Sequence, residues 1–112
     1  MGARVVILES AERDLKDLRS YLVKNFSPDV WRDTYGKLKE AIRHLQDFPL
    51  SGSIPDEIEK FGLTRYRQVV SGMNRIIYEV RHDRIYIHMI IDVRRDMGAL
   101  LTRRLLKDFD LE

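Results

Sequence analysis

Cysteine is absent from this chain of 112 residues, which also has only three histidines, three prolines and one tryptophan. Without cysteine the protein has no disulfide, thiol nucleophile or thiolate metal site, as is usual in a reducing cytoplasm. No apolar run reaches the length of about 18 residues that suggests a membrane-spanning helix, and the N-terminus lacks the pattern of a signal peptide. We therefore expect a soluble, cytoplasmic protein with no membrane association.

Motifs that bind cofactors or metals are missing as well. The histidines and acidic residues show no spacing typical of a metal site, and the sequence has no glycine-rich phosphate loop or serine nucleophile motif. We expect neither a cofactor nor a metal. Because 112 residues suit one compact domain, residues 1–110 are expected to form a single domain.

The local patterns predict a strand, two helices, three strands and a final helix. Ser10 and Ser27 are expected to cap the two helices, with Pro28 at the first position of the second. Because only a few residues separate these helices, they should pack as an antiparallel hairpin. The predicted ranges, in chain order, are 4–8, 11–24, 28–48, 63–71, 75–81, 84–92 and a helix that begins near 94–96. The segment 49–62 is expected to be a loop whose acidic residues Asp56, Glu57 and Glu59 lie in solvent.

Side-chain alternation predicts two different faces for the sheet. One face is expected to be buried and apolar, formed by Ile76, Tyr78 and Val80 on one strand and Ile85, Ile87, Met89 and Ile91 on the next, joined by a two-residue turn at His82-Asp83. The opposite, more open face then receives Arg75, Ile77, Glu79, Tyr86, His88 and Ile90.

The turn around Gly72 decides where two further arginines lie. A two-residue turn would point Arg65 and Arg67 toward the core, where a charge without a partner is costly. A three-residue loop, Ser71-Gly72-Met73, would instead place them on the same face as Arg75. We therefore predict the three-residue loop and a shared arginine face.

Three segments in this order resemble the RelE/ParE family of bacterial toxins. They are ILESAERDLKDLRSYL at 7–22, LTRYRQVVSGMNRIIYEV at 63–80 and IIDVRRDMGALL at 90–101. The resemblance implies an α+β fold of order β-α-α-β-β-β-α, in which a helical hairpin packs on an antiparallel sheet. It also implies the toxin of a type II toxin–antitoxin system, with a cognate antitoxin encoded alongside.

Two subgroups of this family differ in their target. RelE-like members cut messenger RNA in the ribosome, and the resemblance would then place Arg67, Arg75 and Arg94 or Arg95 in the catalytic site. ParE-like members inhibit DNA gyrase. Val69 stands where a second cation is expected in RelE-like members, and Leu100 or Leu101 stands in place of an aromatic acid or base. The ending R-R-D-x-x-x-L-L is closer to ParE, so we favour a gyrase inhibitor over an mRNA endoribonuclease.

The cations between Leu63 and Leu106 are all arginines, whose planar guanidinium groups suit phosphate or carboxylate. On the predicted arginine face, His88 is the candidate base, because histidine has an ordinary pKa near neutrality; this role applies only to a RelE-like enzyme. The residues expected to contact the macromolecular target are Arg65, Arg67, Arg75, Tyr86, Arg94 and Arg95.

The predicted helical hairpin carries apolar residues beyond its core stripe. These are Tyr21, Val30 and Phe48. An amphipathic helix of a partner can bury such residues in a groove. We expect this surface to bind the antitoxin.

Overall fold

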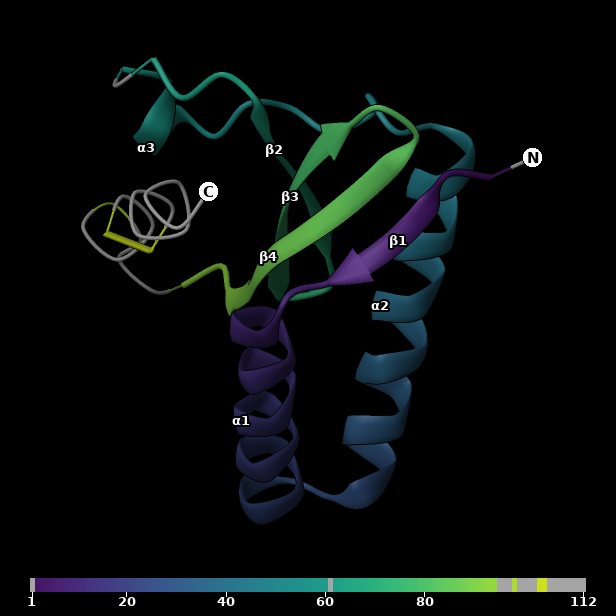
Figure 1. The fold of residues 1–112 in the computed structure, drawn as a ribbon. Helices are drawn as coiled ribbons and strands as arrows, with labels where there is room; N and C mark the ends of the chain where they lie inside the picture. The colour runs from purple at the N-terminus through teal and green to yellow at the C-terminus, as the bar shows by residue number, and fades with distance from the viewer. Residues whose placement is uncertain (1, 61, 95–97, 99–102, 105–112) are drawn as a thin grey trace.

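The computed structural model describes residues 2–60, 62–94, 98 and 103–104, and it has the expected α+β architecture (Figure 1). A long helical hairpin covers one face of a four-stranded sheet and extends beyond it. The elements are β1 (Arg4–Ile7), α1 (Glu9–Asn25), α2 (Pro28–Asp47), α3 (Asp56–Glu59), β2 (Tyr66–Ser71), β3 (Asn74–Arg81) and β4 (Arg84–Asp92). Most of the final helix predicted to begin near 94–96 lies outside the described residues, including Met97, Leu100, Leu101 and Leu105.

The two helices of the hairpin begin in different ways. As predicted, α2 starts at Pro28, and the side chain of Ser27 accepts a hydrogen bond of 3.2 Å from the backbone N–H of Val30. The prediction that Ser10 caps α1 is wrong, because this helix begins at Glu9. The Ser10 hydroxyl instead donates to the carbonyl oxygen of His88 at 3.1 Å. Ser10 therefore joins α1 to the sheet.

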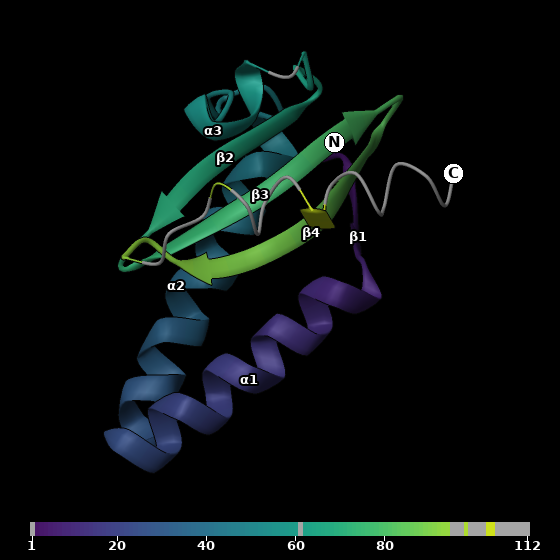
Figure 2. The ribbon, with the colours of Figure 1, turned by 90° about the vertical axis from the view of Figure 1, so that its left-hand side faces the viewer.

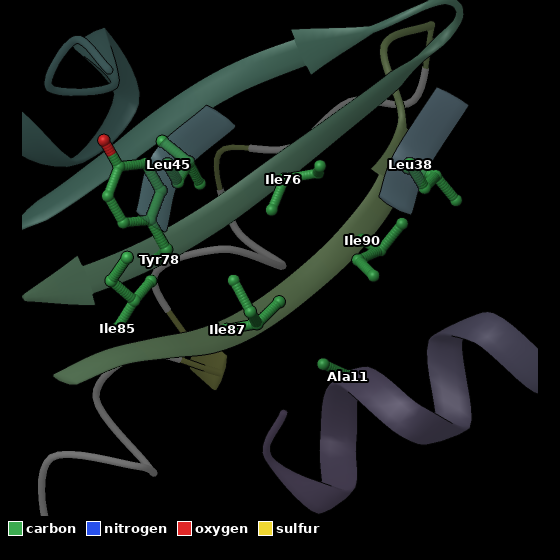
Figure 3. Close-up of a cluster of buried hydrophobic side chains, with 8 residues drawn as sticks. All are labelled: Ala11, Leu38, Leu45, Ile76, Tyr78, Ile85, Ile87 and Ile90. Carbon is green, nitrogen blue, oxygen red and sulfur yellow. The ribbon is translucent and has the colours of Figure 1, made fainter. Parts of the chain in front are cut away.

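The strand order in the sheet is β1-β4-β3-β2. As predicted, β2, β3 and β4 form an antiparallel meander, and β1 adds parallel to β4 at one edge. Figure 2 shows these strands side by side, with α3 next to β2. Between the sheet and the hairpin lies the main core, drawn in Figure 3, which consists of Ala11, Leu38, Leu45, Ile76, Tyr78, Ile85, Ile87 and Ile90.

A register shift in the β3–β4 pair changes the predicted faces. Tyr78 pairs with Ile87, whereas its neighbour Ile77 pairs with Met89, so His88 is an extra residue on β4. Beyond it the alternation of β4 reverses. Ile90 therefore joins the core under the hairpin, and Met89 and Ile91 turn to the opposite face.

The sequence suggested that the face opposite the hairpin is the more open one, but part of this face is buried. It has a second buried cluster, to which α3 contributes one residue. The members are Ile58, Tyr66, Ile77, Met89 and Ile91. The loop predicted at 49–62 thus contains a short helix that covers part of the sheet.

The turn between β2 and β3 has two residues, so the three-residue loop predicted here is wrong. Ser71 pairs with Asn74, which leaves Gly72 and Met73 in the turn. Gly72 has a φ of +59°, a conformation that glycine adopts without steric cost. Arg67 consequently pairs with Tyr78 and lies on the side of the sheet that faces the hairpin.

Candidate functional site

Arg67 lies where the edge of the sheet meets the loop that follows α2. Its Nη1 donates to the carbonyl oxygens of Gly52 at 2.8 Å and Leu50 at 3.4 Å. These backbone acceptors compensate for the partial burial of the charge, which is why the two-residue turn is tolerated. Arg67 and Arg75 lie on opposite faces of the sheet, and the predicted shared arginine face does not form.

Arg75 lies on the face opposite the hairpin, where its side chain is buried in an ion pair. Its guanidinium makes two parallel bonds of 2.7 and 2.9 Å to the carboxylate of Glu57 in α3, and its Nε donates to Gln68 at 2.7 Å. The hydrogen bonds from Arg75 lower the pKa of Glu57, against the effect of burial. Glu57 was expected in solvent, but it holds α3 against the sheet.

Charged side chains surround the buried carboxylate of Glu79 in β3. His88 Nε2 lies 2.8 Å from one oxygen, and Arg81 bonds both oxygens at 2.9 and 3.1 Å. Arg65 approaches to 3.6 Å. Burial alone would raise the pKa of Glu79, but the bonds from His88 and Arg81 outweigh it and hold the pKa at about 2.

His88 was the predicted catalytic base of a RelE-like enzyme. Only 2% of its surface is exposed, its Nε2 is bonded to Glu79, and the edge of its ring meets Tyr66 with the ring centres 5.1 Å apart. A base so enclosed does not reach a substrate hydroxyl. The geometry gives His88 a structural role in holding Glu79.

Arg94 follows β4, and its guanidinium forms hydrogen bonds of 2.9 and 2.6 Å to Asp92. Tyr86 lies half-buried on the face opposite the hairpin, beneath the guanidinium of Arg81 at 5.3 Å. Arg95 lies outside the described residues. The predicted site residues that the structure describes are thus dispersed over two faces or held in ion pairs, and they do not converge on one catalytic centre.

A surface hollow of about 300 Å³ separates the hairpin from the β2–β3 turn. Tyr21 and Val30, both predicted to bind the antitoxin, line it together. The third predicted residue, Phe48, lies at the other end of α2 with its ring 4.9 Å from that of His44. Two further exposed apolar residues, Phe26 and Met73, line the hollow and were not predicted. Phe26 lies in the connection between α1 and α2, and Met73 lies in the β2–β3 turn. An apolar residue in so short a connection is the sequence feature that could have predicted both.

Within residues 2–60, 62–94, 98 and 103–104, no cluster of three or more histidine, cysteine, aspartate or glutamate side chains suited to a metal is present. No helix in the same ranges combines the length and the apolar character needed to cross a membrane.

A family model and a solved structure each match most of this chain. Residues 5–97 match the family model described as the ParE toxin of the type II toxin–antitoxin system, parDE. A solved structure of the chromosomal ParDE TA system from P. aeruginosa has a TM-score of 0.67 at 15% identity, over 80% of this chain and 95% of that chain. No curated protein matches. The structural likeness supports the fold, and the family match, which spans most of the chain, shows that this protein belongs to the ParE toxin family of type II toxin–antitoxin systems.

Proposed function

We propose that this ParE-family toxin inhibits DNA gyrase in the cytoplasm until its cognate antitoxin neutralises it. The family match over residues 5–97 carries the proposal, because it includes the hairpin and all of the sheet except Arg4, the first residue of β1. Inhibition of a large enzyme by surface contact requires no chemistry from the toxin itself.

The placement of the arginines also favours this function over RNA cleavage. Attack by a ribose hydroxyl needs a base, cations at the phosphate and an acid for the leaving oxygen, all at one point. Arg67 and Arg75 are separated by the sheet, and each is engaged by protein acceptors. His88 is enclosed. Within the described residues these groups do not supply the three roles together.

Expression of the toxin without its antitoxin tests the proposal in cells. We expect induction of the SOS response and filamentous growth, because a blocked gyrase leaves broken DNA, while protein synthesis continues at first. Co-expression of the antitoxin should restore normal growth. Immediate arrest of translation without an SOS response would instead favour the ribosome as target and refute the proposal.

The hollow beside the β2–β3 turn is suited to an apolar helix of the antitoxin. Its lining includes Tyr21, Phe26 and Met73, each at least half exposed in the toxin alone. Exposed apolar residues that converge on one hollow are typical of a groove that buries the apolar face of a partner helix. We infer that the antitoxin fills this hollow, and that Phe48 is reached only if the bound segment continues along α2.

Tyr21→Asp is expected to weaken antitoxin binding at least tenfold, about 1.4 kcal/mol, because it places an unpaired charge in the apolar contact. Val23→Asp is the matched control, since Val23 is exposed on the same helix but does not line the hollow. Titration calorimetry with the purified antitoxin compares the two. Equal affinities for the two variants would place the antitoxin elsewhere.

A further inference from the structure

Four arginines cross one end of the sheet, near the β3–β4 turn, on the face opposite the hairpin. In register, Arg4 of β1 pairs with Arg84 of β4, and Arg84 pairs with Arg81 of β3. Arg65, just before β2, extends the row through its contact with Glu79. We call these residues, Arg4, Arg65, Arg81 and Arg84, the arginine strip.

The alternation of side chains along each strand determines the face of the sheet on which the strip lies. Val5, Ile85 and Val80, which neighbour strip residues along their strands, pack on the core under the hairpin. Arg4, Arg84 and Arg81 therefore point to the opposite face. The side chains of Arg81 and Arg65 are 38% and 36% exposed, and Arg4 and Arg84 are exposed residues. The strip is accessible along its whole length.

Within the residues that the structure describes, two members of the strip, Arg4 and Arg84, have no acidic partner. Like charges directly opposite one another on neighbouring strands are destabilising, and this arrangement occurs twice here. Glu79 compensates Arg81 and Arg65. Arg4 and Arg84 form no ion pair with another residue in the described ranges, although Asp83 lies in the adjoining turn. An anionic ligand would relieve this repulsion.

Two of the four guanidinium groups are already held in place. Arg81 is bonded to Glu79 and lies over the ring of Tyr86 at 5.3 Å, and Arg65 lies over the ring of Tyr66 at 5.2 Å. Arg81 uses its Nε and one Nη for Glu79. The paired N–H groups that match phosphate oxygens are therefore those of Arg4 and Arg84, and Arg81 and Arg65 add fixed positive charge beside them. The strip therefore has the chemistry of a phosphate-binding surface.

We propose that the arginine strip binds the phosphate backbone of duplex DNA. Adjacent strands lie roughly 4.8 Å apart, so Arg4, Arg84 and Arg81 form a close row of identical cations, which suits a backbone of repeated phosphates. Arginine also occurs in the hot spots of protein interfaces, but those hot spots lie in well-packed, desolvated pockets, whereas Arg4 and Arg84 stand exposed in a row. The inference rests on the proposed function: the DNA is that which gyrase holds, and the strip allows the toxin to contact enzyme and DNA together.

The test measures binding of the purified toxin to a fluorescein-labelled duplex of about 20 base pairs, by anisotropy at roughly 50 to 200 mM salt. For the wild type, log K should fall with log salt with a slope of about −3.6, since each of the four arginines neutralises one phosphate and each neutralised phosphate contributes about −0.9. Arg4→Gln with Arg84→Gln should weaken binding about tenfold at low salt and make the slope less steep by about 2.

The control variant loses the same two positive charges, but on α2 of the hairpin instead of on the strip. Arg32→Gln with Arg43→Gln removes two exposed arginines of α2, and it should bind the duplex like the wild type. If the glutamine pair on the strip fails to fold, Arg4→Lys with Arg84→Lys replaces it. The lysine pair should keep the salt slope and lose part of the affinity.

Three results would overturn the proposal: no duplex binding at low salt, equal weakening in the strip and control variants, or a polyglutamate peptide that binds the strip in preference to the duplex. Gyrase supercoiling, measured with the same samples, separates this proposal from the proposed function. A toxin that binds the duplex but leaves gyrase active refutes the function and retains the strip. A toxin that inhibits gyrase without binding the duplex refutes the strip alone.

Discussion

Replacing Glu79 by glutamine is expected to lower the free energy of unfolding by about 3 kcal/mol, the low end of the range for removing one partner of a buried ion pair, because the side chain of Arg81 is 38% exposed. Glu79 is 1% exposed and accepts bonds from His88 and Arg81. Glutamine has nearly the same size, but its neutral amide does not compensate the guanidinium of Arg81. The loss is therefore electrostatic and involves little change in packing.

The same carboxylate should make the stability depend on acid pH. Its pKa is lowered from 4.5 to about 2 in the folded protein, so its contribution is complete above about pH 4.5 and is lost as the pH falls toward 2. The shift corresponds to about 3 kcal/mol. Glu57, whose pKa is also lowered, contributes in the same direction, so only the difference between wild type and Glu79→Gln isolates Glu79.

Urea unfolding between pH 7 and pH 2 measures both effects. The wild type should lose more stability than Glu79→Gln across this interval. Glu40→Gln removes an exposed carboxylate of α2 and serves as the control, with an expected change below about 0.5 kcal/mol. If Glu79→Gln were as stable as Glu40→Gln at neutral pH, the buried network would not have the role assigned to it.

Arg75→Ala is expected to reduce stability by about 2 kcal/mol, less than for a fully buried pair because Glu57 retains some exposure. The side chains of Arg75 and Glu57 are 10% and 31% exposed. The substitution releases Glu57 and weakens the attachment of α3 to the sheet. Gyrase inhibition by the folded variant should stay within about twofold of the wild type.

A double-mutant cycle with Glu57→Ala checks the pairing. The double variant should lose less than the sum of the single variants, with a coupling of about 1–2 kcal/mol. Additive losses would show that the two residues stabilise the fold independently. A folded Arg75→Ala that no longer inhibits gyrase would show that Arg75 contacts the target, as the sequence first suggested.

The sequence predicted the order of β1, α1, α2, β2, β3 and β4 because each of them has a local signal, but it missed the short helix α3. The pattern around Ser27-Pro28 placed the start of α2 correctly, and the two-residue turn at His82-Asp83 pairs Arg81 with Arg84 as predicted. The family resemblance quoted from three short segments agrees with the match over residues 5–97. These features depend on residues that are close together in the chain, so local sequence patterns predict them.

The arrangement of the arginines depends on distant residues and was not predictable in this way. Burial of charge argued against a two-residue turn at Gly72, but Arg67 finds backbone acceptors in a loop 15 residues earlier. The extra residue His88 reverses the alternation of β4, and no local pattern marks it. Glu57, which looks like a solvated loop residue, reaches Arg75 only after α3 has folded onto the sheet.

The arginine strip also depends on residues that are distant in the chain. Arg4 stands in the first strand of the sequence and Arg84 in the last, and they become neighbours only because β1 adds parallel to β4 at the edge of the sheet. Arg4 lies outside the arginine-rich second half of the chain, so the sequence prediction did not include it. The surface that the fold assembles contains Arg65 from the predicted set, joined by three arginines that were not assigned to the site.

Supercoiling of relaxed plasmid by purified gyrase, with increasing amounts of toxin, tests the central claim most directly. We expect supercoiling to be lost in proportion to the toxin added, and to return when equimolar antitoxin is present. Undiminished supercoiling at saturating amounts of folded toxin, together with cleavage of messenger RNA in the ribosomal A site, would contradict the account.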